Sequence, residues 1–407
     1  MTSEAPRQAY VWIWLPDATD PVVCGRLDRR DDRYVFSYGR SYLDRADAVP
    51  IYESELPLDD FEHEPLDGPM PLCIDDAAPD SWGRSVINAN LGVVGSELDP
   101  LVYLLQSGSD RVGAIDFQAS ATEYAPRSPV HAPLDQLMAA ADMIDSGESI
   151  DEDLAAALVN GTPLGGARPK ALIDDDGVKL LAKFSRRNDT FLWVQSEYLG
   201  MELARRAGLD VAPVRYVETM GRGVLLVERF DRPTTGARRR VVSAATILSM
   251  QTMVAARHFS YIDLADEIRA QFVQPDRTLR ELFSRIMFNI LVGNTDDHAR
   301  NHAAFILEDG LALTPAYDVS PQPRAGEMAR HPRFGDGDTG RESRVAALVD
   351  AAPIYHVDPD EARAIAQHQV DTIHDAWDEV CDTAQLTTAQ RTGLLKGPIL
   401  NPFAFYK

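Results

Sequence analysis

One short segment, residues 289–302 with the sequence NILVGNTDDHARNH, gathers groups that can handle protons and bind cations. It begins as an apolar helix, passes Gly293, and then places Asp296 and Asp297 close to two histidines and Asn301. A carboxylate can accept the proton of an attacking hydroxyl, and carboxylate and carboxamide oxygens are the ligands that Mg²⁺ prefers. These residue types directly behind a helix make the segment the first candidate for a catalytic site.

The order of three residues predicts a particular chemistry. Asp296 and Asn301 stand in a D-x-x-x-x-N pattern, and Asp318 in PAYDVSP follows after a predicted hairpin. Protein kinases have the same order in their catalytic half: a catalytic-loop aspartate, an asparagine, a hairpin and a metal-holding aspartate. In such a site one carboxylate orients the attacking hydroxyl, while the carboxamide and the second carboxylate hold Mg²⁺ on the phosphates. The pattern therefore predicts phosphoryl transfer.

Two other interpretations of this segment stay open. Asn, Thr and Asp favour polar turns, so the segment can be simply the polar end of a helix. His298 and His302 are four residues apart, the spacing that puts two imidazoles on one helical face, with Asp297 alongside, as in zinc sites. The sequence has no glutamate in the H-E-x-x-H position, which disfavours zinc hydrolysis.

Features upstream favour the kinase interpretation. A kinase needs a lysine on a strand behind a glycine-rich loop, and a helical carboxylate that pairs with it. Residues 161–170, GTPLGGARPK, form such a loop, and Lys183 lies on a strand that follows. Glu197 lies on the apolar face of the next predicted helix, where a charge needs a partner, so we expect it to pair with Lys183. The alternative is a surface glutamate. LLVERFD at 225–231 ends a strand where a hinge would offer backbone groups to adenine.

Hydrophobic patterning predicts a β-rich first part and a helical second part. Strands are expected where aromatic and β-branched residues cluster, and helices where apolar residues recur at helical spacing. The expected strands cover 10–15, 34–38, 171–173, 178–184, 214–219, 223–230 and a hairpin within 302–314. The expected helices cover 134–143, 151–159, 191–206, a helix with a capping box of Thr278 and Glu281, and one from Asp358 to about 382.

The connecting segments divide the chain. Turns are expected at 26–33, RLDRRDDR, a proline-rich linker at 124–135, and a mobile loop at 321–343. We therefore predict an α+β, protein-kinase-like fold with a β-rich N-lobe, a helical C-lobe and an extra N-terminal α/β subdomain. The segments are residues 1–120 for the N-terminal subdomain, 121–235 for the N-lobe, and 236–407 for the C-lobe.

Bulk composition limits the classes of partner. The net charge of −23 argues against this surface holding nucleic acid or an anionic membrane unaided. Cys24, Cys73 and Cys381 are far apart and in no metal-binding spacing, which predicts buried thiols of a reducing cytoplasm. The sequence has no recognisable secretory signal and no apolar run of the length of a membrane span, so we expect a soluble, cytoplasmic protein.

Several motifs, taken together, resemble a known family. GTPLGGARPKAL, LLAKF, LLVERFDR, NILVGNTDDHARNHAAFIL and LTPAYDVSP, in this order, resemble the HipA-like serine/threonine kinases of bacterial toxin–antitoxin systems. The stretch from CGRLDRRDDRYVFSY to YESELPL, with DDAAPDSWGRSVI and GSDRVGAIDF, resembles that family's amino-terminal subdomain. The resemblance covers most of the chain, and NTDDHARN with AYDVSP is its most specific part.

The resemblance implies roles for individual residues. Asp296, rather than Asp297, would be the catalytic aspartate, and Asn301 and Asp318 would bind Mg²⁺. Lys183 would contact the phosphates, with Glu197 as its ion-pair partner. The remaining ATP-binding positions would be Gly165, Gly166, Ala167, Arg168, Pro169 and Lys170 in the phosphate-side loop, Glu228, Arg229 and Phe230 in the adenine hinge, and His298 and Tyr317 in the lining of the nucleotide site.

The family also implies an activity and partners. Its members transfer the γ-phosphate of ATP, with Mg²⁺, to protein serine or threonine, and its best-known type arrests growth by modifying a glutamyl-tRNA synthetase. A small helix-turn-helix antitoxin, HipB-like, would bind the kinase and take it to operator DNA, so DNA would be bound only indirectly and no membrane would be involved. Two alternatives stay open: a nucleotide-binding regulatory module without activity, and a kinase of a small molecule or lipid.

One position departs from the family pattern. Family members often carry a serine just before the glycines of the loop, where autophosphorylation ejects the loop and silences the kinase. Here Pro163 occupies that place, with Thr162 adjacent. Because proline has no hydroxyl and its fixed φ stiffens the loop, we expect this chain to lack the self-inactivating switch. Phosphorylation of Thr162 is the alternative.

Overall fold

The chain forms two compact units, which are described separately. The computed structural model describes residues 5–66, 68–93, 97–127, 132–148, 154, 157–159, 168–251, 253–324 and 326–406. The first unit comprises Met1–Arg187, Thr219–Arg222 and Glu228–Val242, and the second Asn188–Glu218, Gly223–Val227 and Ser243–Lys407. The predicted boundaries near residues 120 and 235 follow sequence features rather than these units and stay predictions.

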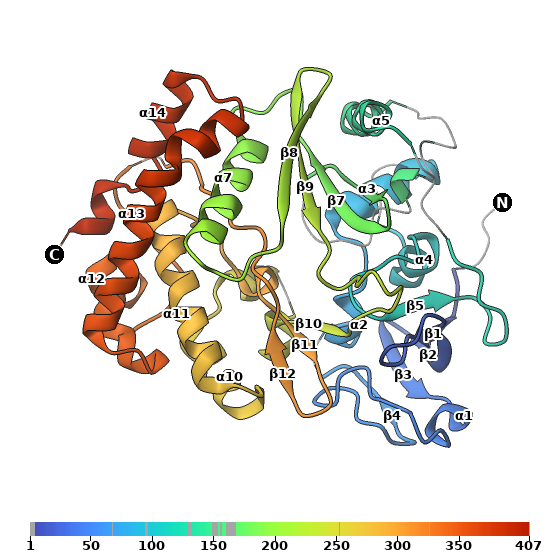
Figure 1. Cartoon of the computed structure of the whole chain (residues 1–407). Helices are drawn as coiled ribbons and strands as arrows, with labels where there is room; N and C mark the ends of the chain where they lie inside the picture. The colour runs from blue at the N-terminus through green and yellow to red at the C-terminus, as the bar shows by residue number, and fades with distance from the viewer. Residues whose placement is uncertain are drawn as a thin grey trace. The chain divides into compact units, whose positions relative to one another are not determined.

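The first unit contains a five-stranded antiparallel sheet with strand order β4-β3-β2-β1-β5 (Figure 1). Gly25 lies so close to Phe36 that a Cβ on it would be 2.5 Å from a ring carbon, so the two central strands pair only with glycine there. The strands are β1 Gln8–Ile13, β2 Val22–Arg30, β3 Arg33–Tyr38, β4 Glu62–His63 and β5 Ile115–Gln118.

The expectation of a turn over residues 26–33 is wrong. Strand β2 continues through Arg30, and only residues 31–32 turn the chain, with Asp31 in the left-handed region at φ 58°. Along the strand Leu27 is buried, while Arg26 donates to Asp28 at 2.8 Å on the outer face. The charged residues therefore lie on the solvent side of a strand. In the sequence this density of charged residues looks like that of a turn, which explains the wrong prediction.

A hairpin and several helices complete the first unit. Strands β6 Lys170–Asp175 and β7 Val178–Phe184 pair antiparallel, with Lys170 opposite Lys183. Asp176 and Gly177, both at positive φ, make the predicted turn. The predicted helix at 151–159 lies largely outside the described residues. The helices are α1 Arg40–Leu43, α2 Leu72–Asp75, α3 Ser81–Asn90, α4 Pro100–Gln106 and α5 Leu134–Ser146.

The beginning of the predicted linker at 124–135 is fixed to this sheet. Tyr124 Oη and Arg127 Nη2 donate to the Asp116 carboxylate at 3.1 and 2.9 Å. The same buried carboxylate accepts from Arg111 Nε at 2.7 Å. Two arginines and a tyrosine thus hold one carboxylate of β5, and this part of the linker belongs to the packed unit.

The second unit is mainly helical, with two hairpins. Strands β8 Val214–Thr219 and β9 Arg222–Glu228 pair around Met220 and Gly221, and β11 Ala303–Ile306 pairs with β12 Leu311–Leu313. A short strand, β10, spans Val241–Ser243, where the chain passes from the first unit into the second. The α-helices are α7 Trp193–Arg206, α8 Ala244–Ile247, α9 Met253–Arg257, α10 Tyr261–Gln271, α11 Pro275–Val292, α12 Val345–Ala351, α13 Pro359–Thr383 and α14 Thr388–Lys396.

Helix α11 is the centre of this unit, and it packs against α10, α12 and α13 (Figure 1). The predicted apolar stripe is confirmed, because its members are completely buried. They are Leu279, Leu282, Phe283, Ile286, Met287, Ile290 and Leu291. Burial of this many large side chains on one helix fixes its position, and therefore the position of the segment that follows it.

The expected capping box at the start of α11 is wrong. The helix begins one turn earlier, at Pro275 after Gln274. Thr278 Oγ1 donates to the Gln274 carbonyl at 2.8 Å from inside the helix, and Glu281 accepts from Arg285 Nε at 2.8 Å. Pro275 explains the difference, because its fixed φ suits the first helical position and its missing N–H costs nothing there.

The predicted start of α13 is confirmed, since Asp358 accepts the N–H of Asp360 at 2.8 Å ahead of a helix that begins at Pro359. The segment 321–343, expected to be mobile, contains packed residues. Phe334 is completely buried, and the Tyr261 N–H donates to the Arg333 carbonyl at 2.7 Å. The low average hydrophobicity of this segment predicted mobility, because an average over the segment does not reveal the few residues that pack.

Two properties inferred from composition can be compared with the structure. Cys24, Cys73 and Cys381 are buried free thiols, as predicted. Within the described ranges, every helix is too short or too polar to cross a membrane.

Candidate active site

The end of helix α11 places the polar segment of residues 293–302. Gly293 ends the helix in the left-handed region at φ 69°, and a Cβ there would lie 2.6 Å from the Pro398 carbonyl oxygen. Both facts require glycine, because other residues are strained at this φ and too large for this contact. The chain can therefore leave the buried helix sharply at the start of the segment that carries Asp296 and Asp297.

Asp297 anchors this segment from the inside. It is only 5% exposed, and its carboxylate accepts from Asn289 Nδ2 at 2.9 Å, from Tyr261 Oη, and interacts with His302 Nε2 at 3.0 Å. Burial by itself would raise the pKa of Asp297, but His302 and Tyr261 hold this pKa below its ordinary value. Tyr261 keeps its proton, because burial and then the Asp297 charge raise its pKa well above the usual range.

Asp296, the adjacent residue, faces outward. Its side chain is 55% exposed, and Arg257 Nη2 lies 3.6 Å from its Oδ1. An exposed ion pair at this distance contributes little stability and opens readily. The two neighbouring aspartates thus differ in environment: Asp297 is a fixed anchor, and Asp296 is the carboxylate that a substrate can reach. This agrees with the assignment of Asp296 as the candidate catalytic residue.

A short 3₁₀ turn, Ala299–Asn301, orients the asparagine. The Asn301 N–H donates to the His298 carbonyl at 2.8 Å, and its amide nitrogen donates to the Asp296 carbonyl at 3.4 Å. Since the nitrogen end of the carboxamide is engaged in this way, its oxygen is the end left for a cation. A carboxamide oxygen is a donor type that Mg²⁺ accepts.

His298 lies among the carboxylates of the site. Burial lowers its pKa, while the charges of Asp297, Asp296 and Asp318 act in the opposite direction. Because the pKa falls below its ordinary value, His298 is neutral at pH 7 and does not cancel the negative charge offered to a cation.

The zinc interpretation relied on a helical backbone between His298 and His302, and that premise is wrong. His298 has φ −150° and ψ 169°, and His302 has φ −122° and ψ 138°, so both are extended. They do not share a helical face, and His302 Nε2 is already bound to Asp297. Elsewhere in the described part of the chain, His, Cys, Asp and Glu form no cluster of three that would hold a metal.

Asp318 has a strained backbone, at φ 55°. Such a conformation costs of order 1 kcal/mol for a non-glycine residue and persists where surrounding contacts impose it. Ala316 supplies one such contact, because its N–H donates to the Asp210 carbonyl at 2.8 Å. On the other side, helix α7 approaches so closely at Gly200 that a Cβ there would lie 2.1 Å from the Val319 carbonyl oxygen.

Tyr317 connects the two halves of this site, since its Oη donates to the Arg300 carbonyl at 2.9 Å. A small pocket lies beside Tyr317, and it is lined by residues of α11, of the segment 294–302 and of the segment 316–319 that follows β12. The lining residues include Asn289, Asn294, Asp297, Asn301, His302 and Tyr317. Of the predicted residues, Asn301 and Tyr317 line this pocket, while Asp296, His298 and Asp318 are close to lining residues in the chain.

The remaining predicted residues belong to the other unit, except Glu197. Gly165, Gly166 and Ala167 lie outside the described residues. Lys183 lies on β7 in the first unit, and Glu197, only 8% exposed, lies on α7 in the second. Their ion pair, and the convergence of Lys183 with Asp296, stay predictions.

Lys170 has a partner that the sequence did not indicate. Its ammonium group is 1% exposed and lies 2.5 Å from Asp80, which caps helix α3. The neighbouring Arg168 and Pro169 end the described part of the loop, and the Pro169 carbonyl accepts the Phe184 N–H at 2.9 Å. The Lys170 side chain thus holds the base of the loop against α3, which differs from the phosphate contact expected for it.

The strand exit Glu228–Phe230 was expected to offer backbone groups to adenine. The Arg229 N–H donates to the Lys179 carbonyl at 2.9 Å, and the Arg229 guanidinium is buried among carboxylates. The groups of Arg229 are therefore used within the protein. Glu228 and Phe230 remain the predicted contacts at this position.

Comparison with known proteins assigns the family. Residues 15–118 match the HipA N-terminal domain, and residues 162–377 match the HipA-like C-terminal domain. The second match alone covers more than half of the chain. The chain belongs to the HipA-like family.

Several curated relatives share shorter stretches with this HipA-like chain. The putative kinase Y4mE of Sinorhizobium fredii is 29% identical over 31% of the chain and 31% of that protein. The serine/threonine-protein kinase toxin HipA of Shewanella oneidensis is 28% identical over 31% of the chain and 33% of its own length. The toxin YjjJ of Escherichia coli is 24% identical over 66% of the chain and 64% of that protein. The chain thus spans about a third of the length of the first two relatives.

A solved structure confirms the predicted fold class. HipA of Shewanella oneidensis, in a complex with HipB and its operator DNA, has a TM-score of 0.67 and 17% identity. The alignment covers 95% of this chain and 96% of that one. The expected α+β fold, with a kinase-like β-rich part, a helical part and an additional N-terminal subdomain, is therefore correct.

Sequence reasoning missed the anchor residues. Asn289 and Tyr261 act through Asp297, and neither stood out beside the catalytic pattern. A signal was present, because Asn289 is a polar residue inside the apolar repeat of α11, and a buried carboxamide must have partners.

Proposed function

We propose that this chain is an ATP- and Mg²⁺-dependent serine/threonine protein kinase that acts as the toxin of a toxin–antitoxin pair. The observation that supports this most is the arrangement of the second unit. Asp296 is exposed and adjoins the buried anchor Asp297, and the Asn301 amide donates to the Asp296 carbonyl. Asp318, in the left-handed region, directly follows Tyr317, which lines the same pocket as Asn301. Family membership supports the same conclusion.

Each residue has a role in the proposed reaction. The Asp296 carboxylate accepts the hydrogen of the substrate hydroxyl, whose oxygen forms a bond to the γ-phosphorus. The bond from that phosphorus to the bridging oxygen breaks, and ADP leaves with its electron pair. Asn301 and Asp318 would hold Mg²⁺, which supplies charge neutralisation on the phosphates when bound. Lys183 would contact the phosphates.

The partners follow from charge and from the relatives. A chain with net charge −23 needs a basic partner to approach DNA. The similar HipA of Shewanella oneidensis has been solved together with HipB and operator DNA. We infer a HipB-like helix-turn-helix antitoxin for this chain, and a cellular protein, with an aminoacyl-tRNA synthetase as the first candidate, as the substrate.

One assay tests the proposed activity. The purified chain is incubated with γ-labelled ATP and Mg²⁺, with and without bacterial lysate, beside the Asp296→Asn variant. Label on serine or threonine of a protein, lost in the variant, is the expected result. Nucleotide binding without transfer would contradict a kinase and indicate a regulatory module. Label found only in small molecules or lipids would contradict a protein kinase.

A further inference from the structure

A buried cluster of four charges lies beside the strand exit that follows β9. It consists of Asp110, Arg229, Asp231 and Arg232, whose side chains are 14%, 4%, 5% and 6% exposed. We call these residues the charge cluster. All belong to the first unit, but Asp110 comes from the segment before β5, more than a hundred residues earlier in the chain.

The two arginines hold both carboxylates in a closed network. Arg229 Nε and Nη2 donate to Asp231 at 3.0 and 2.8 Å, and Arg229 Nη1 donates to Asp110 Oδ1 at 3.0 Å. Arg232 Nε donates to Asp110 Oδ1 at 2.6 Å, and its Nη1 donates to Asp231 Oδ2 at 2.9 Å. Forked guanidinium contacts of this kind fix orientation as well as charge.

The same network holds the backbone of residues 110–113. The carbonyls of Asp110 and Arg111 accept from Arg229 at 3.0 and 2.7 Å, and the Gly113 N–H donates to Asp231 Oδ2 at 2.9 Å. Burial favours neutral carboxyls, but the two arginines hold the pKa of Asp231 below its ordinary value, so the network stays charged at pH 7.

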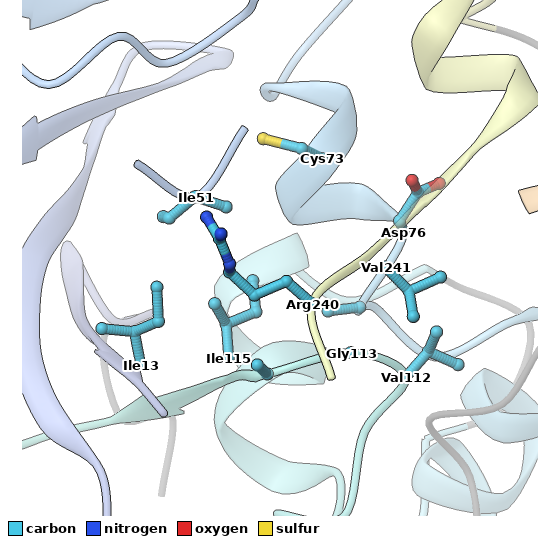
Figure 2. Close-up of a pocket in the computed structure, with 11 residues that line it drawn as sticks. Ile13, Ile51, Cys73, Asp76, Val112, Gly113, Ile115, Arg240 and Val241 are labelled. Atoms are coloured by element: carbon cyan, nitrogen blue, oxygen red, sulfur yellow. The ribbon is translucent and has the colours of Figure 1, made fainter. Parts of the chain in front are cut away.

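Residues 110–113 continue directly into the N-terminal sheet. Gly113 and Ile115 line a small pocket beside β1, together with Cys73 and Arg240 (Figure 2). Arg240 crosses this pocket and donates to the Pro50 carbonyl at 2.9 Å. The Trp14 N–H donates to the Ala114 carbonyl at 2.9 Å, and Ile115 pairs with Ile13 of β1, so the segment behind the charge cluster is attached to the sheet.

The strand exit is therefore held from two sides. The Arg229 N–H donates to the Lys179 carbonyl of β7, and the Arg229 side chain binds residues 110–113. Hydrophobic residues of similar volume stabilise a buried site as well as an ion network does, so stability alone does not explain four buried charges. What the network adds is a fixed position for the backbone of Glu228–Phe230.

We propose that Asp110 and Asp231 are positioning residues for nucleotide binding, through which the N-terminal subdomain holds the Glu228–Phe230 backbone in the geometry that reads adenine. This inference rests on the proposed function, because Glu228–Phe230 is the adenine hinge only if the chain binds ATP. It gives the N-terminal subdomain a part in the kinase reaction, although its residues need not touch the substrate.

The test uses the full-length chain and four variants. Asp110→Asn and Asp231→Asn remove one charge each at nearly constant shape, and Arg232→Lys keeps the charge but loses the forked contact. The control is Asp142→Asn, since Asp142 is 9% exposed and is also held by two arginines of the first unit, Arg187 and Arg222. Each protein is measured for ADP affinity by calorimetry, for KM and kcat with ATP, and for preference of ATP over GTP.

The expected result is a weaker interaction with adenine nucleotide only. In the charge-cluster variants, ADP affinity should fall and KM for ATP should rise, each roughly tenfold. This is the size of effect expected when about one hydrogen bond to the base is lost. The value of kcat should stay within about twofold of the wild type. The preference for ATP over GTP should fall, which partial unfolding would not cause. Asp142→Asn should match the wild type. If Asp110→Asn fails to fold, Arg232→Lys carries the test.

Other results separate the possible failures. Unchanged ADP affinity and unchanged ATP preference in the folded variants overturn the positioning role. Equal losses in Asp142→Asn overturn it too, since they indicate general destabilisation. Altered ADP affinity without phosphoryl transfer by the wild type supports positioning and contradicts the proposed kinase. A wild-type chain that binds no adenine nucleotide overturns both.

Discussion

Substitution of Asp297 by alanine should destabilise the protein strongly, whereas the same change at Asp296 should not. Asp297 is 5% exposed and meets three groups: Asn289 Nδ2 at 2.9 Å, His302 Nε2 at 3.0 Å and Tyr261 Oη. Alanine leaves these three polar groups buried without their acceptor. Each such group costs about 1–3 kcal/mol, offset in part because a buried charge is also removed.

The expected loss of unfolding free energy is therefore about 3–5 kcal/mol for Asp297→Ala. Asp296 is 55% exposed and has one ion pair at 3.6 Å, so Asp296→Ala should change stability by no more than about 0.5 kcal/mol. Although Asp296→Ala should be nearly as stable as the wild type, it should lose phosphoryl transfer activity. The adjacent positions thus separate anchoring from catalysis.

Urea denaturation followed by tryptophan fluorescence and circular dichroism measures this difference, with the m-value checked for constancy. The folded-state pKa of Asp297 is depressed. Its contribution is therefore fully present above the ordinary aspartate pKa of about 4 and is lost as pH falls through the lower folded value. The difference in unfolding free energy between wild type and Asp297→Ala should shrink as pH falls below about 4. Wild-type stability in Asp297→Ala, or an equal loss in Asp296→Ala, would refute the reasoning.

Further predictions concern two glycines on helices, Asp318 and the loop at residues 160–170. Gly200→Ala should cost about 1–3 kcal/mol and raise the Mg²⁺ concentration for half-maximal activity, because its Cβ would meet the Val319 carbonyl 2.1 Å away, next to Asp318. In Gly393→Ala on α14 the new Cβ meets no atom within 4 Å, so the unfolding free energy should rise by up to about 1 kcal/mol because alanine has the higher helix propensity. Chemical denaturation of both variants therefore distinguishes the steric clash at Gly200 from the general effect of replacing a helical glycine. Asp318→Asn should lower kcat at least about a hundredfold with the fold retained, as circular dichroism would show, since a neutral amide neutralises Mg²⁺ poorly; wild-type kcat would contradict the metal role. Mass spectrometry after self-incubation with ATP should find no phosphate at residues 160–170, and phosphate on Thr162 would contradict the absence of the loop switch.

Local pattern and motif order predicted much of this protein. The apolar stripe of α11 and the turn at Asp176-Gly177 needed only spacing and conformational preference, and both are present. The order of Asp296, Asn301 and Asp318 also located the region where the second unit assembles its polar groups.

Contacts between distant segments could not be predicted. Lys170 pairs with Asp80, and Arg229 pairs with Asp110 in addition to its near neighbour Asp231; nothing in the local sequence specifies the two distant partners. The misplaced cap at Thr278 has a different cause. The sequence contains two possible helix starts within one turn, Pro275 and the Thr278–Glu281 capping box, and the helix begins at Pro275.

A crystal structure of the chain with Mn²⁺ and a non-hydrolysable ATP analogue would test the central claim most directly. The anomalous signal of Mn²⁺ should lie between the Asn301 carboxamide oxygen and the Asp318 carboxylate, with the γ-phosphate facing Asp296 and within reach of Lys183. A metal bound elsewhere, or a nucleotide whose γ-phosphate is remote from Asp296, would contradict the account.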